Sequence, residues 1–79
     1  MKDIVVMNPT VTIATQRFKD FVRCNERLIS AVYKTQRKVK LLNDRYIFFK
    51  GETEGENALL GLYADVISYA EFLDIWVMR

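Results

Sequence analysis

Residues 3–33 of the chain read DIVVMNPTVTIATQRFKDFVRCNERLISAVY. The run opens with apolar, mostly β-branched residues, and the turn signal Asn8-Pro9-Thr10 closes it, so we expect a buried strand over residues 3–7. Proline at a helix entry and a threonine cap predict that a helix follows directly. Apolar side chains then recur every three or four residues. This spacing predicts one long amphipathic helix over about residues 11–33, packed on the core by one face.

Three further strand signals and a second helix follow. Residues 38–42 alternate briefly, and residues 45–50 are strongly β-forming, so the turn pair Asn43-Asp44 between them predicts a hairpin. Residues 66–69 indicate another buried strand, and residues 71–78 a short terminal helix. Strand–helix–strand order favours a sheet with at least one parallel pair. We therefore predict a single α/β domain of all 79 residues, with a small mixed sheet of about four strands in β-α-β-β-β-α order.

Composition excludes several classes of enzyme. The chain has no histidine, which removes the commonest general base and the commonest metal ligand. Its one cysteine, Cys24, excludes an internal disulfide and a Cys-x-x-Cys metal knuckle, and a lone thiol is typical of the reducing cytoplasm. No apolar run is long enough for a transmembrane helix. We expect a cytoplasmic protein that is not an enzyme, with no catalytic residue, no metal, no cofactor and no membrane partner.

Charge is unevenly distributed along the chain, although the net charge is only +2. Basic residues gather between residues 17 and 40, and acidic residues dominate from residue 41 onward. Such asymmetry is typical of a surface that binds nucleic acid or a protein partner. The candidate phosphate-binding residues, on the basic face of the expected long helix and just after it, are Lys19, Arg23, Arg27, Lys34, Arg37, Lys38 and Lys40. The competing interpretation is a solvated face that keeps a hydrophobic small protein in solution.

Two sets of apolar residues also have two interpretations each. The aromatic residues Tyr46, Phe48 and Phe49 fit core packing, which the alternation favours, or stacking on bases, as sheet aromatics do in RNA-binding modules. The apolar end of the chain either folds back onto the sheet or docks on another chain, which predicts a protein partner or a homo-oligomer. The candidate partner-binding residues there are Phe72, Ile75, Trp76 and Met78.

Four stretches carry a family resemblance. Residues 4–10 read IVVMNPT, residues 45–51 RYIFFKG, residues 59–65 LLGLYAD and residues 66–72 VISYAEF. In this order they resemble elements of the motor ATPase of tailed-phage large terminases: a strand–helix unit, a strand with an aromatic, a basic residue and a glycine, a leucine–glycine–alanine–aspartate turn, and the Walker B strand. The resemblance spans nearly the whole chain and implies a central fragment of that α/β core.

The chain departs from that family at the residues that carry its chemistry. The phosphate-cradling Walker A loop, G-x-x-x-x-G-K-[ST], is missing. The Asp-Glu pair of Walker B is here Ala70-Glu71, and alanine cannot hold magnesium. A second interpretation of Glu71 is a helix-entry carboxylate favoured by the helix dipole.

The resemblance therefore implies a non-catalytic phage-type protein of the host cytoplasm. It would bind a protein partner, as a decoy, inhibitor or regulator derived from a DNA-packaging motor. The alternative is a small nucleic-acid-binding accessory protein that uses the basic helix face.

Overall fold

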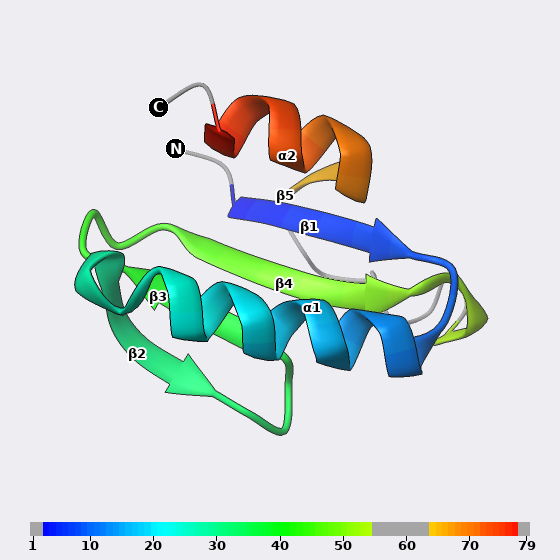
Figure 1. Cartoon of the computed structure of the whole chain (residues 1–79), viewed down its shortest axis with the longest axis horizontal. Coiled ribbons are helices and arrows are strands. Elements are labelled where there is room, and N and C mark those ends of the chain that lie inside the picture. Colours follow the sequence, from blue (N-terminus) through cyan, green and yellow to red (C-terminus); the bar gives the residue numbers. More distant parts are fainter. Residues whose placement is uncertain (1–2, 55–63, 78–79) are drawn as a thin grey trace.

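The structure is a computed structural model that describes residues 3–54 and 64–77. Figure 1 shows its strands and helices, and the described residues form the following elements. They are β1 (Asp3–Asn8), α1 (Val11–Cys24), β2 (Ile29–Tyr33), β3 (Lys38–Leu41), β4 (Tyr46–Gly51), β5 (Ala64–Ser68) and α2 (Tyr69–Val77), with short 3₁₀ turns at Glu26–Leu28 and Glu52–Glu54.

The strands form one mixed sheet in the order β2-β3-β4-β1-β5. Strands β2, β3 and β4 are an antiparallel meander, whereas β1 is parallel to both of its neighbours, β4 and β5. The predicted class is therefore confirmed: a mixed sheet with one longer helix and a short C-terminal helix. The described residues hold one strand more than the four expected.

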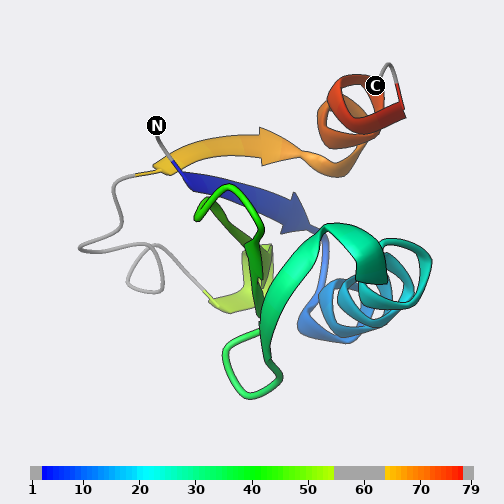
Figure 2. The same cartoon turned by 90° about the vertical axis from the view of Figure 1, so that its left-hand side faces the viewer.

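Both helices pack on the same face of the sheet (Figures 1 and 2), α1 against β1 and β4, and α2 against β1 and β5. The core between the layers is aromatic, and Phe49 on β4 lies at its centre. Its ring centroid is 5.7 Å from that of Phe21 on α1 and 5.9 Å from that of Phe72 on α2. Among the described residues the opposite face of the sheet carries no helix, and we refer to it as the helix-free face.

The start of α1 follows the sequence signals. Thr10 is the N-cap, and its hydroxyl accepts a hydrogen bond from the backbone N–H of Ile13 at 3.2 Å, as a capping residue does. Gly51 at the end of β4 lies against this cap, because a Cβ built on it would be 2.5 Å from the nitrogen of Val11. The absence of a side chain at Gly51 therefore lets the helix begin directly beside the sheet.

The end of α1 corrects the sequence prediction. The helix ends at Cys24 and not near residue 33. The backbone N–H of Asn25 makes the last helical hydrogen bond, to the carbonyl of Phe21 at 3.0 Å, and the Asn25 side-chain amide donates to the same carbonyl at 3.0 Å. After the 3₁₀ turn the chain forms β2, which pairs with β3. The β-branched and aromatic residues of Ile29–Tyr33 fit a pleated strand as well as a helix face, and their pairing with β3 decides between the two.

The predicted hairpin, the last strand and the short helix are confirmed with small shifts in their bounds. The last strand is not buried as expected, because it lies at the end of the sheet, where Val66 is 50 % exposed. Strands β3 and β4 are antiparallel and joined by a tight turn, in which Asp44 takes a positive φ of 67°. Strand β5 covers Ala64–Ser68, and α2 begins at Tyr69, two residues before the expected start. Across residues 3–54 and 64–77 no helix has both the length and the apolar character needed to cross a membrane.

Candidate nucleic-acid interface

The seven predicted phosphate-binding residues do not share one face. Lys19, Arg23 and Lys34 border a groove beside α1, Arg27 lies in the 3₁₀ turn after it, and Arg37, Lys38 and Lys40 lie at the start of β3 and along it. The prediction of a single basic helix face is therefore wrong, because it required α1 to continue past Cys24. Because the helix ends early, the basic residues that follow it lie in turns and strands and are spread over both faces of the sheet.

On the helix-free face, side chains from adjacent strands line up in rows. Because alternate residues of a strand point to opposite faces, the register of the strands identifies the members of each row. One row crosses the whole sheet and consists of Tyr33, Lys38, Phe48, Val5 and Val66. Tyr46 and Lys50 lie two residues before and after Phe48 on β4, and so face the same side.

Aromatic rings surround a lysine on this face. The Nζ atom of Lys38 lies 4.5 Å from the ring centroid of Tyr33 and 4.8 Å from that of Tyr46. The ring centroid of Phe48 is 5.6 Å from the same atom and 6.0 Å from Lys50 Nζ. These contacts are within the range of cation–π interactions. We call the five residues Tyr33, Lys38, Tyr46, Phe48 and Lys50 the aromatic–lysine patch.

The patch has excess positive charge. Burial lowers the pKa of Lys50 from its ordinary value of 10.5, and the charges of Arg37 and Lys38 lower it further. Among the described residues no carboxylate forms an ion pair with Lys38 or Lys50, whereas Lys40 pairs with Asp44 at 3.5 Å. Burial is the larger cause of this lowered pKa, and the like charges of Arg37 and Lys38 add to it. Such a surface favours an anionic ligand.

The structure separates the three aromatic residues that the sequence grouped together. Phe49 is fully buried in the core, which confirms the packing interpretation for that residue. Tyr46 and Phe48 lie partly exposed on the helix-free face, and for these two residues base stacking stays a prediction. Tyr33 and Lys50 were missed. Lys50 could have been predicted from the sequence, because it follows the same alternation as Tyr46 and Phe48. Tyr33 could not, because it reaches this face only if β2 is a strand.

The carboxyl ends of the parallel strands, where α/β sheets often bind ligands, are occupied by the protein's own side chains. Asn8 is buried, and its amide donates to the carbonyls of Val6 and Lys50 at 3.1 and 3.2 Å. Its Oδ1 accepts from Arg17 at 2.8 Å, and the Arg17 guanidinium stacks 3.8 Å from the ring centroid of Tyr69. This connected network ties β1, β4, α1 and α2 together and is a structural feature.

The residues aligned with Walker B begin a helix. Strand β5 ends at Ser68, and Ala70 and Glu71 lie in the first turn of α2. The Ser68 hydroxyl accepts from the backbone N–H of Glu71 and donates to its Oε1, both at 3.2 Å. A serine hydroxyl that accepts from the backbone N–H three residues later stabilises a helix entry, and here the Glu71 carboxylate also holds that hydroxyl in place. The geometry supports the helix-entry interpretation of Glu71.

The predicted partner-binding residues divide between the core and the surface. Phe72 is only 2 % exposed and packs on Phe21 and Phe49, so its prediction as a docking residue is wrong. Trp76 also folds back, since its ring contacts Phe21 and its Nε1 donates to Asn25 at 3.1 Å. Ile75 is 43 % exposed and stays available. Met78, like residues 59–63 of the terminase-like turn, lies outside the described residues.

No family model, curated protein or solved structure matches the chain. The likeness to the large-terminase motor, and with it the phage origin, stays a prediction.

Proposed function

We propose that this protein binds single-stranded nucleic acid on the helix-free face of its sheet. The observation that carries the proposal is the aromatic–lysine patch, in which Lys38 lies within 5.6 Å of three ring centroids. Proteins that bind single strands combine aromatic platforms, on which bases stack, with cations that follow the phosphate backbone. The patch supplies both on adjoining strands. The free, exposed thiol of Cys24 fits a cytoplasmic setting.

Each residue type has a separate task in this proposal. Tyr46 and Phe48 are successive outward-facing residues of β4, with ring centroids 6.4 Å apart, and they present two faces to successive bases. Lys38 and Lys50 neutralise phosphates beside those bases. Arg37 adds positive charge next to them, since it is one of the cations that lower the pKa of Lys50. Lys40 contributes less because Asp44 already pairs with it.

The arrangement favours a single strand over a duplex. Bases reach an aromatic side chain with their flat faces only when they are unstacked from one another. A duplex offers the patch only its phosphates, which give a sequence-independent and salt-sensitive attraction. We therefore expect a labelled single-stranded oligonucleotide to bind more tightly than the same sequence as a duplex, and the difference to persist as salt is raised.

Fluorescence anisotropy with a labelled single-stranded oligonucleotide tests the proposal. Tyr46→Ala is expected to weaken binding by about fivefold to a hundredfold, the equivalent of roughly 1–3 kcal/mol for one lost stacking partner. Phe48→Leu removes the aromatic face while it keeps an apolar side chain in the sheet. The double variant Lys38→Gln/Lys50→Gln is expected to weaken binding and to reduce its dependence on salt.

The matched control is Lys19→Gln/Lys34→Gln, which removes the same charge from the groove beside α1. Binding of the oligonucleotide by this variant should stay close to that of the wild type. Equal losses in the two double variants would show that only net charge matters and would overturn the proposal. The proposal would also be overturned if Tyr46→Ala bound the oligonucleotide with unchanged affinity and had a circular dichroism spectrum like that of the wild type.

A second candidate function is binding of a protein partner, as the resemblance to a packaging motor implies. Support comes from apolar side chains that remain exposed near the C-terminal end of the described chain: Val66 is 50 % exposed, Leu73 38 % and Ile75 43 %. This candidate predicts that the purified protein hydrolyses no ATP. Turnover that disappears in Glu71→Gln would contradict it.

A further inference from the structure

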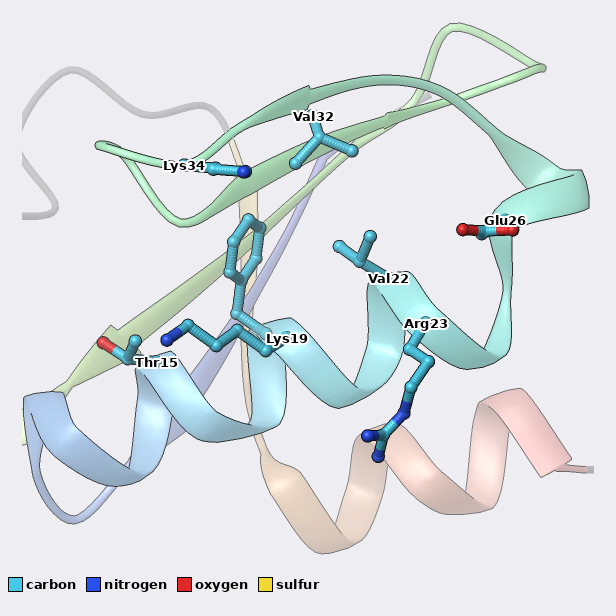
Figure 3. A pocket seen from close by; sticks show the side chains of 8 residues that line it. Thr15, Lys19, Val22, Arg23, Glu26, Val32 and Lys34 are labelled. Atoms are coloured by element: carbon cyan, nitrogen blue, oxygen red, sulfur yellow. The ribbon is translucent and has the colours of Figure 1, made fainter.

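A groove of about 520 Å³ lies between α1 and β2, on the helix-covered side of the sheet and away from the aromatic–lysine patch. Figure 3 shows the side chains that line it. Phe18 and Val22 of α1 and Val32 of β2 supply its apolar wall. Its volume is within the range of small-molecule sites in proteins.

The groove exists because β2 extends the sheet beyond the cover of α1. Val32 pairs with Val39 of β3, which is fully buried under the helix layer. One strand further out, Val32 itself is 38 % exposed. Ile29 at the start of β2 still packs against the core, but at Val32 the packed core stops at β3, and Val32 forms an open wall facing Val22.

Positively and negatively charged side chains lie at opposite ends of the groove. Lys19 and Lys34 extend over the same end from opposite sides, one from α1 and one from the turn after β2, whereas Glu26 lies at the other end (Figure 3). Arg23 points away from the apolar wall and pairs with Asp20 at 2.8 Å. Among the described residues neither Lys19 nor Lys34 has a carboxylate partner within ion-pair distance.

We propose that this groove binds the anion of a fatty acid, with the carboxylate between Lys19 and Lys34 and the alkyl chain along Val22 and Val32. The two ammonium groups match one carboxylate, and the apolar wall matches an alkyl chain. Glu26 at the far end repels a second negative charge, so a molecule with one anionic end fits better than one with two. This site shares no residue with the aromatic–lysine patch and does not depend on the proposed nucleic-acid binding.

The length of the groove also fits an alkyl chain. Lys19 and Arg23 are one helical turn apart, and the wall from Thr15 to Arg23 covers about 12 Å at 1.5 Å per residue. A medium-length fatty acid fills such a groove. An amphipathic peptide helix is about 10 Å across and would touch the apolar wall only with part of one face.

Isothermal titration calorimetry with decanoate, below the concentration at which it forms micelles, tests the proposal. Decanol serves as the control ligand without the charge, and octanoate as the control ligand with a shorter chain. We expect decanoate to bind more tightly than both. Each added methylene should raise the affinity by up to about fourfold, because burial of one methylene is favourable by that factor.

Two variants with matched controls assign the site. Lys19→Gln/Lys34→Gln is expected to lower decanoate affinity at least tenfold, whereas Lys38→Gln/Lys50→Gln, on the other face, should leave it unchanged. Val32→Phe fills the groove from an exposed position on an edge strand and should abolish binding. The same substitution at the exposed Val66 on β5 should leave decanoate binding unchanged.

The remaining outcomes overturn the proposal. Equal affinity for decanoate and decanol would show an apolar surface without recognition of the carboxylate. Equal losses in the two lysine double variants would show adsorption driven by net charge. Decanoate that fails to bind, while an acidic amphipathic peptide binds and loses affinity in Val32→Phe, would assign the groove to a protein partner instead.

Discussion

Lys50 shows at the scale of one residue how a partly buried charge can oppose stability. Burial and the nearby charges of Arg37 and Lys38 lower its pKa below the ordinary value of 10.5, which the unfolded chain retains. As pH rises, the folded protein therefore loses this proton before the unfolded chain does. Stability then increases with pH between the lowered pKa and 10.5, and at neutral pH the charged Lys50 destabilises the fold.

Lys50→Gln is therefore expected to unfold at a slightly higher urea concentration than the wild type at neutral pH. This advantage should disappear as pH rises through the lowered pKa toward 10.5, because the wild-type lysine then becomes neutral too. Urea unfolding, monitored by the fluorescence of Trp76, measures both the difference in stability at neutral pH and its disappearance at higher pH. The same variant should bind the oligonucleotide more weakly. A variant that is less stable than the wild type at neutral pH would contradict the assignment.

At the scale of secondary structure, the N-terminus of α2 tests the role of Glu71. Ser68→Ala removes the oxygen that accepts from the Glu71 N–H and is expected to lower the free energy of unfolding by about 1 kcal/mol. Glu71→Gln should cost much less, because glutamine also serves in a capping pair. Chemical denaturation of the two variants measures the difference. A Glu71→Gln loss as large as that of Ser68→Ala would mean that the charge of Glu71 has a further role.

The elements that the sequence predicts well are those with local causes. Thr10 caps α1 through an atom three residues away, and the β3–β4 hairpin closes across a short turn. Strand β2 could not be predicted with the same rules, because Ile29 and Val32 fit both periodicities and their partners lie on β3. That one boundary also determines the candidate site, since Tyr33 joins the aromatic–lysine patch only if residues 29–33 form a strand.

At the scale of the whole molecule, the sheet order predicts a gradient of protection. Strands β1 and β4 each have a neighbour on both sides, whereas β2 and β5 lie at the ends of the sheet. Local opening is easiest where few buried contacts are lost, so hydrogen exchange should be slowest in β1 and β4 and fastest in β2 and β5. Mass spectrometry of peptides from each strand measures this order. Protection of β2 equal to that of β4 would indicate that another chain covers the edge.

The two parallel pairings of β1 also have a consequence for synthesis of the chain. Ile4 pairs with Ile47 on one side and with Asp65 on the other, so β1, which is synthesised before the other strands of this sheet, must wait for β4 and β5. Antiparallel neighbours such as β3 and β4 can meet as soon as both have been made. Pairing between distant segments is slow and leaves apolar strands exposed in the meantime. The apolar residues of β1 are thus made early and buried late, which makes this strand the part of the nascent chain that most needs protection from aggregation.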